Sequence, residues 1–424
     1  MKRVLSFILC AMICLSACAC KVTSVTDVGQ APISETDTEP AENSLIIVDN
    51  EYITQTVVWH GMDKYDDYCI STIVENKSNK DLAIFWENCV VNGWMCSCWE
   101  WEELAPGASM AVDITLYSYD LEVSGIDTID EIGFNIVIED SDDWLSDPLV
   151  NEIFYIYPTG LSADEVKHHT RQPQENEFTV LDENGYTVII ENPRFDNDYY
   201  LIDCYFANST EKTVSSYLEN LIIDGWCIDI YGAGIDMLPG SQYRETISLD
   251  KETLSEIGVS EPNEISFELS LEDVELVRQD PDSYGNILVM REAIYPTGLT
   301  ADQIVSPERT PVDGEVVVVD NEYITLIITG YEFDDMWGYV FDGYCLNKTD
   351  MPITLDIDEV SIDGKMSDAI WMNELPSSTQ AYVQIETIAT EEADNPSEFE
   401  FRLRVYANDD YDQQLMFERI SYNP

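Results

Sequence analysis

The sequence has little positive charge: 20 Lys and Arg residues stand against 83 Asp and Glu residues, giving a formal net charge of −63 at pH 7. So acidic a chain repels nucleic acids and anionic membrane surfaces, which excludes both as direct partners. Hydrophobic residues nevertheless make up 45% of the chain, so it is able to bury real cores and is not a disordered acidic tail.

Histidine is also scarce, with only His60, His168 and His169 in the chain. A Ser/His/Asp or Cys/His catalytic site needs a histidine in a pocket. None of the three recurs between the repeats described below, and two lie side by side in a polar linker. We therefore expect no enzymatic activity.

The cysteines form no CxxC pair and do not recur at equivalent positions of the repeats. This pattern excludes a shared disulfide framework and argues against a zinc ribbon. Several cysteines stand in apolar strand contexts, where a free thiol behaves as a small hydrophobic side chain. We expect most of them to be buried thiols.

Long apolar runs are missing except at the start of the chain. Lys2 and Arg3 precede a mostly apolar segment, residues 4–15. The motif LSAC, residues 15–18, closes this segment. The charged start and short apolar run are typical of a signal peptide, and the small residues before Cys18 resemble a bacterial lipobox. The resemblance implies that residues 1–17 are removed, that Cys18 is lipidated, and that the protein is anchored on the extracellular face of the cell membrane through this lipid. Residues 18–43 then form the lipidated N-terminus and a flexible stalk.

The remainder of the chain repeats. Residues 48–54 (VDNEYIT) return unchanged at 319–325, and 181–187 (LDENGYT) is the middle copy. Three further markers follow in the same order in each copy. They are an Asn-x-Ser/Thr triplet at Asn76, Asn208 and Asn347, an Asn-Gly or Asp-Gly pair at Gly93, Gly225 and Gly364, and a Leu-Pro turn near residues 105, 239 and 376.

Later in each copy, hydrophobic residues alternate strictly, as at Phe134, Ile136 and Ile138. This period of two predicts strands with one buried face. Short strands separated by turn signals predict an all-β protein of three tandem immunoglobulin-like β-sandwich domains. We place the domains at 44–160, 178–298 and 315–424, with linkers at 161–177 and 299–314. One short helix per copy is expected near residues 251–257, and capping boxes at Ser162 and Thr300 predict a brief helix in each linker.

The order of these turn motifs resembles the uncharacterised extracellular immunoglobulin-like repeat domains of Firmicutes (clostridial) lipoproteins. The resemblance covers residues 44–424 and implies a fold and a cellular address. It brings no settled activity and no catalytic residues.

Three tryptophans, Trp94, Trp99 and Trp101, fall within eight residues of the first repeat. They are candidates for an aromatic platform that binds a sugar ring or a hydrophobic partner. On a strand, Trp99 and Trp101 share one face and Trp94 lies on the other, a pattern that ordinary core and edge packing also produces.

Acidic loops offer a second candidate site. Asp140, Asp142 and Asp143 are close enough in sequence to hold Ca²⁺ through carboxylate oxygens, although no twelve-residue calcium-loop pattern is present. A solvated acidic loop is the simpler interpretation, and no other cofactor is expected. The Asn-x-Ser/Thr triplets are interpreted as turns rather than glycosylation sites, because Asn readily bonds its own backbone in a turn.

Three functional hypotheses follow. The first is a non-enzymatic cell-surface lipoprotein that displays tandem immunoglobulin-like domains as a spacer or a protein-interaction module. The second is a glycan-binding surface lipoprotein that uses the aromatic patch of the first repeat. The third, which the sequence disfavours, is a hydrolase accessory protein or an enzyme. The expected partners are the membrane, through the lipid, and a surface protein or a glycan.

Overall fold

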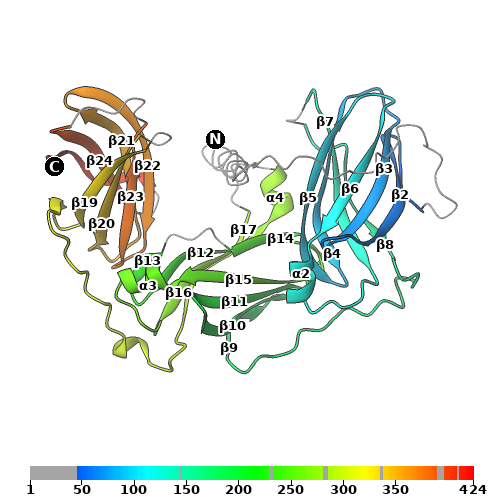
Figure 1. The fold of residues 1–424 in the computed structure, drawn as a ribbon, viewed down its shortest axis with the longest axis horizontal. Coiled ribbons are helices and arrows are strands. Elements are labelled where there is room, and N and C mark those ends of the chain that lie inside the picture. The colour runs from blue at the N-terminus through cyan, green and yellow to red at the C-terminus, as the bar shows by residue number, and fades with distance from the viewer. Residues whose placement is uncertain are drawn as a thin grey trace. The chain divides into compact units, whose positions relative to one another are not determined.

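A computed structural model describes residues 45–143, 146–228, 233–279, 285–334, 338–388, 396–407 and 410–424. The leader, Cys18 and the stalk lie outside the described residues, so the predictions about them are not addressed by the fold. The described residues are dominated by β-strands, which confirms the all-β prediction (Figure 1).

The strands and helices fall into three groups, one for each repeat. The first repeat forms β1 (Leu45–Asp49), β2 (Ile53–Met62), β3 (Tyr68–Asn76), β4 (Leu82–Val91), β5 (Trp94–Leu104), β6 (Ser109–Leu116), α2 (Ser118–Val123), β7 (Ile132–Asp140) and β8 (Val150–Ile156). The second forms β9 (Glu177–Glu183), β10 (Tyr186–Asp196), β11 (Tyr199–Asn208), β12 (Val214–Ile223), β13 (Trp226–Ile228), β14 (Ala233–Met237), β15 (Gln242–Asp250), α3 (Lys251–Glu256), β16 (Ile265–Asp273), α4 (Val274–Gln279) and β17 (Asn286–Ile294). The short 3₁₀ helix η1 (Ala301–Gln303) precedes the third repeat, which forms β18 (Val316–Asp320), β19 (Ile324–Asp334), β20 (Gly338–Asn347), β21 (Ile353–Ile362), β22 (Lys365–Leu375), β23 (Gln380–Glu386), β24 (Phe399–Ala407) and β25 (Asp410–Tyr422).

Equivalent strands of the repeats pair in equivalent ways. In the first repeat, the sheet β1-β2-β3-β6 faces strands in the order β8-β7-β4-β5. The second repeat has β9-β10-β11-β15 and β13-β12-β16-β17, and the third has β18-β19-β20-β23 and β22-β21-β24-β25. This is a repeated β-sandwich architecture. Two sheets also continue from one repeat into the next, because β5 pairs with β15 and β13 pairs with β23.

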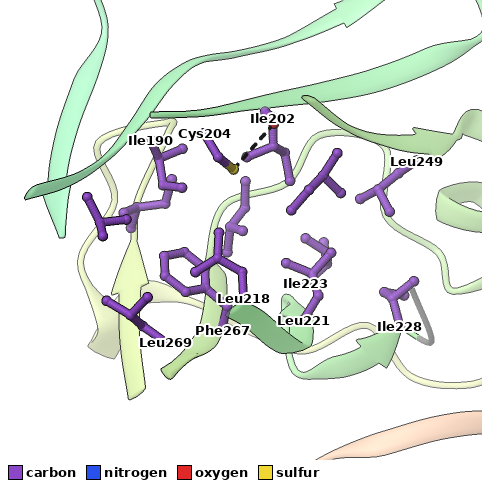
Figure 2. Close-up of a cluster of buried hydrophobic side chains, with 14 of the residues drawn as sticks. Ile190, Ile202, Cys204, Leu218, Leu221, Ile223, Ile228, Leu249, Phe267 and Leu269 are labelled. Carbon is purple, nitrogen blue, oxygen red and sulfur yellow. Dashed lines mark hydrogen bonds between the residues drawn. The ribbon is translucent and has the colours of Figure 1, made fainter. Parts of the chain in front are cut away.

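The buried side chains follow the predicted alternation on β16 and β24, but not on β7, where residues 132–138 are all buried and the prediction of one buried face is wrong. Phe267 and Leu269 on β16 and Phe401 and Leu403 on β24 are buried, with more exposed residues between them. Each repeat supplies most of one large hydrophobic cluster. Figure 2 shows part of the second cluster, where Ile190 and Cys204 from one sheet pack toward Phe267 and Leu269 from the other. The contacts join residues 45–424 into one compact unit, so the three domain boundaries remain a prediction.

The Asn-x-Ser/Thr triplets are turns, as predicted. Asn76, Asn208 and Asn347 are all buried at the ends of equivalent strands. Each side-chain amide donates to the carbonyl four residues on, at 2.8, 2.7 and 2.9 Å respectively. The Oδ1 of each accepts a hydrogen bond from the following Ser or Thr hydroxyl. Because these amide groups are buried, their hydrogen bonds stabilise the turns from inside the fold.

The predicted short helix is α3, and α2 occupies the equivalent place in the first repeat. The matching part of the third repeat lies partly outside the described residues. In the linkers, Thr300 makes both capping-box bonds and starts η1, whereas the Ser162 box closes only a turn. No described helix has the length and apolar character needed to cross a membrane.

Cys69, Cys89, Cys96, Cys98, Cys204 and Cys345 are free thiols, and all of these except Cys69 are buried. Burial raises the pKa of the Cys89 and Cys204 thiols well above the usual value, so they remain protonated. This agrees with the prediction of buried thiols that act as small hydrophobic side chains.

Candidate functional site

The structure separates the three tryptophans of the predicted aromatic platform. Trp94 is only 1% exposed, whereas Trp99 and Trp101 are 66% and 45% exposed. All three lie on β5, but Trp94 belongs to the buried start of the strand. A surface platform in the first repeat therefore consists of Trp99 and Trp101 alone, and Trp94 has another role.

Trp99 and Trp101 lie two residues apart and share one face of β5, about 7 Å apart along the strand. The Trp101 ring stacks on Phe85 of the neighbouring β4, with centroids 6.3 Å apart and planes inclined by 20°. Opposite Trp99 stands Glu87, whose carboxylate accepts hydrogen bonds from Asn135 and Arg278, each at 3.3 Å. The exposed face thus combines flat apolar surface with a fixed carboxylate.

Trp94 lies at a junction between the first and second repeats, which we call the first junction. Its indole Nε1 donates to the carbonyl of His169 in the linker, at 3.1 Å. The side-chain amide of Gln242 donates to the same carbonyl at 3.1 Å, and Gln242 in turn accepts a bond from the Tyr205 hydroxyl at 2.8 Å. The backbone N–H of Gln242 donates to the carbonyl of Gly93 at 2.9 Å. The carbonyl of His169 in the linker therefore accepts one hydrogen bond from each of the two repeats.

A buried ion-pair network surrounds this framework. Glu191 is 2% exposed and accepts bonds from Arg171 at 2.6 Å and from Arg244 at 2.9 Å. The Arg171 guanidinium lies 4.9 Å from the ring centre of Tyr205, and that of Arg244 lies 5.4 Å from the ring centre of Trp94. Both distances fit cation–π contacts. Arg244 also donates to the carbonyl at the end of α2, at 3.1 Å.

The same framework recurs between the second and third repeats, at what we call the second junction. The Trp226 indole and the Gln380 side-chain amide both donate to the carbonyl of Pro307, at 3.2 and 3.1 Å. The Tyr344 hydroxyl donates to Gln380 at 2.7 Å, and Arg309 lies 5.0 Å from the ring centre of Tyr344. The Trp–Tyr ring geometry is nearly identical, 5.9 Å and 63° at the first junction and 5.8 Å and 62° at the second.

The glycine before each tryptophan is required at these junctions. Gly93 and Gly225 have φ of +86° and +85°, which favours glycine. A Cβ at Gly93 would also meet the His168 ring at 2.9 Å, and one at Gly225 would collide with the Ser306 side chain. The linker therefore passes directly over the turn that positions the tryptophan.

The junction residues do not occur in all three repeats. In the third repeat, the exposed Lys365 follows Gly364 where the other repeats have tryptophan. In the first repeat, Ile73 and Ser109 stand where the later repeats have the tyrosine and the glutamine. Among the described residues, the junction framework thus occurs at the two boundaries between repeats.

The junction residues were not predicted from the sequence, although a signal was present. A tyrosine stands three residues before each of the last two Asn-x-Thr triplets, and Arg171 and Arg309 each precede a glutamate by six residues. Comparison restricted to the repeats that follow another repeat would have shown both patterns.

The predicted calcium ligands lie in a turn whose first residue forms an ion pair with a lysine. Asp140 pairs with Lys80 at 2.7 Å, and this hydrogen bond holds the pKa of Asp140 below its usual value. The backbone N–H groups of Asp142 and Asp143 donate to Asp140. In the second repeat, Lys212 and Asp273 form the equivalent pair. Among the described residues, no group of three or more His, Cys, Asp and Glu side chains is placed to hold a metal ion, so calcium binding stays a prediction for a titration to decide.

Comparisons with known proteins do not assign a family. No protein-family model matches the chain, and no curated protein matches it. A 1.5-MDa bacterial ice-binding adhesin aligns over 84% of this chain and 90% of its own structure, with 9% identity and a TM-score of 0.15. The α-2-macroglobulin of E. coli aligns over 89% of this chain and 23% of its own, with 10% identity and a TM-score of 0.16. Because these TM-scores are very low, neither similarity carries an argument about function.

Proposed function

We propose that this chain is a non-enzymatic cell-surface lipoprotein whose tandem immunoglobulin-like sandwiches act as a spacer or a protein-interaction module. The observation that supports this most strongly is the recurrence of one junction framework at both boundaries between repeats. A chain that only tethers independent modules needs no such framework. A chain that must hold successive modules at a set separation does.

The junctions restrict motion by a specific means. Neighbouring domains joined by an ordinary linker are expected to move relative to one another. Here a linker carbonyl, at His169 or Pro307, accepts two hydrogen bonds, one from each flanking repeat. A rotation about the linker breaks these bonds and uncovers a buried indole, which costs free energy.

Small-angle X-ray scattering tests the spacer role on the exported chain. The double variant Gln242→Ala with Gln380→Ala removes both bridging amides, and we expect a broader distribution of dimensions than in the unsubstituted chain. Gln384→Ala is the matched control, because Gln384 lies exposed on the same strand as Gln380 and binds only within the third repeat. If the unsubstituted chain already scatters as freely jointed modules, the spacer proposal fails.

The lipid anchor is a separate part of the proposal and rests on the motif that ends at Cys18. Replacing Cys18 with Ala removes the acceptor thiol, so the protein should leave the membrane fraction and appear in the medium. If the variant still sediments with membranes, the lipobox interpretation is wrong.

Glycan binding by the first repeat is the second candidate. The exposure of Trp99 and Trp101 on one face favours it, since two open indole faces beside the Glu87 carboxylate suit a flat, hydroxyl-rich ligand. A glycan array should give binding that Trp99→Ala with Trp101→Ala abolishes. Trp59→Ala is the control, because Trp59 is an exposed tryptophan on β2 outside this face. Equal loss in the control would show that general surface hydrophobicity is responsible.

A further inference from the structure

A cavity of about 480 Å³ opens beside the first junction, between α2 of the first repeat and β15 of the second. Its chemistry is set by three tyrosines, two carboxylates and one arginine: Tyr117, Tyr119, Tyr243, Asp120, Glu245 and Arg244. Neither the spacer role nor the junction framework uses the carboxylate of Glu245. The cavity is therefore a feature that still lacks an explanation.

Glu245 carries an unsatisfied oxygen. The Tyr243 hydroxyl and the Gly234 N–H hydrogen-bond to its carboxyl group, yet Oε2 is buried and has no hydrogen-bond partner among the described residues. Burial raises the pKa of Glu245 to about 7. Buried carboxylate oxygens without partners are rare in folded proteins because they are costly, and they frequently mark a place where a bound group completes the structure.

The neighbouring arginine does not neutralise this carboxylate. Arg244 is bonded to both oxygens of Glu191 and to the carbonyl of Val123. One oxygen of Asp120 accepts a hydrogen bond from the backbone N–H of Ser97, at 2.7 Å. The lining therefore carries two carboxyl groups against one arginine, whose donors are already bonded to Glu191 and Val123.

The tyrosines add a second element of recognition. Tyr117 and Tyr119 are largely exposed and flank the opening, while Tyr243 is more deeply buried. Aromatic rings attract cations through their negative faces, and they also cover short alkyl chains. Carboxylates with tyrosines around them suit an organic cation better than an inorganic one, which prefers a shell of oxygen ligands.

We propose that this cavity binds a small primary alkylammonium ion, whose N–H groups donate to the carboxylate of Glu245 and whose alkyl chain lies among the tyrosines. A primary ammonium has three donors and no acceptor, which matches the carboxylate oxygens of Asp120 and Glu245 in the lining. The proposal does not depend on the lipid anchor or on the spacer role, because the cavity requires only that the first junction is formed.

The second junction is an internal control for this inference. At the positions equivalent to Tyr243 and Glu245 it has Ala381 and Val383, and the position equivalent to Asp120 is Thr253. The junction framework is thus preserved there without the chemistry of the cavity. One site per chain is expected.

Isothermal titration calorimetry of the whole exported chain, carrying Cys18→Ala to keep it soluble, tests the proposal. The probes are n-butylammonium chloride, tetramethylammonium chloride and n-butanol, at fixed ionic strength. We expect n-butylammonium to bind saturably at one site, with at least about tenfold higher affinity than either of the other two. Equal binding of tetramethylammonium, or a weak non-saturating signal from the acidic surface as a whole, would overturn the proposal.

Two variants assign the binding to the cavity. Glu245→Gln should weaken n-butylammonium binding by at least about tenfold. Glu386→Gln should leave it unchanged, because Glu386 is a partly buried carboxyl on the equivalent strand of the third repeat, and burial raises its pKa as well. Tyr119→Ala alters an exposed side chain and should weaken binding without affecting folding, which a melting curve checks. Unchanged affinity in both Glu245→Gln and Tyr119→Ala would refute the assignment.

The pH dependence supplies an independent readout. The titratable or charged groups around Glu245 are Tyr243, Tyr119, Asp120 and Arg244. The pKa of Glu245 is about 7, so its charge changes between pH 6 and pH 8. The affinity for n-butylammonium should therefore rise with pH by up to roughly tenfold, with proton release near pH 7. An affinity independent of pH over this range would contradict a role for Glu245.

Discussion

The two junctions share one hydrogen-bond framework and differ in the side chain that covers the tryptophan. Both use a tryptophan, a glutamine, a tyrosine and a linker carbonyl in the same hydrogen-bond pattern. They differ in what covers the indole. At the first junction, Arg244 lies over Trp94 and donates to the carbonyl of Val123. At the second, Tyr382 packs 5.0 Å from Trp226 and its hydroxyl reaches the carbonyl of Glu256 at 3.5 Å.

This difference shows which parts of the junction are fixed. Arg244 and Tyr382 occupy the same position on equivalent strands, and each reaches the last carbonyl of the preceding short helix. A long side chain that covers the indole and ends in a donor is sufficient there. The hydrogen bonds to the linker carbonyl recur unchanged, so they specify the register between repeats.

The largest expected effect is the loss of either tryptophan. Trp94→Ala and Trp226→Ala each remove a fully buried indole and a hydrogen bond, and each should lower the free energy of unfolding of the repeats concerned by about 3–5 kcal/mol. Urea titration measures this. The exposed Trp59→Ala should change it by less than about 0.5 kcal/mol. A large effect at only one junction would break the equivalence that we draw between them.

Glu191 distinguishes the first junction from the second. Glu191→Gln leaves Arg171 and Arg244 without their shared buried carboxylate, so a destabilisation of about 3 kcal/mol is expected. The equivalent residue of the third repeat is Thr329, which is partly exposed, and Thr329→Val should cost less than about 1 kcal/mol. Similar values in urea titrations of the two variants would show that the ion-pair network adds nothing to the first junction.

The sequence predicts the all-β class and the turns, but not the junctions. Turn chemistry and alternation are local, so Asn76, Asn208 and Asn347 could be identified as equivalent turn residues from their neighbours alone. The junction depends on residues far apart in sequence, such as Trp94, His169 and Gln242, whose meeting is set by the packing of two repeats. Trp94 was singled out, but its clustering with Trp99 and Trp101 suggested a platform, since sequence does not show that the start of β5 is covered.

Glycine-to-alanine substitutions test whether the linker contacts the turn that precedes each junction tryptophan. Gly93→Ala and Gly225→Ala place a Cβ both in a strained backbone and against the linker, whereas Gly107→Ala, at φ +70°, places one in open space. All three share the backbone strain of about 1–2 kcal/mol. The first two should cost roughly 1 kcal/mol more in urea titrations. Equal costs for all three would mean that the linker does not lie on the turn.

Glu245 gives the smallest effect, and its sign depends on pH. Its folded-state pKa of about 7 lies above the ordinary value of 4.5, so folding favours the protonated form. Below about pH 4.5 the carboxyl is neutral in both states, and the penalty grows as the pH rises toward 7. Glu245→Gln should therefore melt like the unsubstituted chain near pH 5 and be more stable at pH 8, on the order of 1 kcal/mol after allowance for partial exposure. No gain at pH 8 would show that the carboxylate is already satisfied.

The most direct test of the junction account is hydrogen exchange at the tryptophan indoles, followed by NMR on protein labelled with ¹⁵N-tryptophan. Substitution of Trp94 and Trp226 by Phe assigns their Nε1–H signals. Both should exchange slowly and at similar rates, because both indoles are buried and donate to a linker carbonyl, while Trp99 should exchange within the first spectrum. If the indoles of Trp94 and Trp226 exchange as fast as that of Trp99, the repeats are not held together by these junctions.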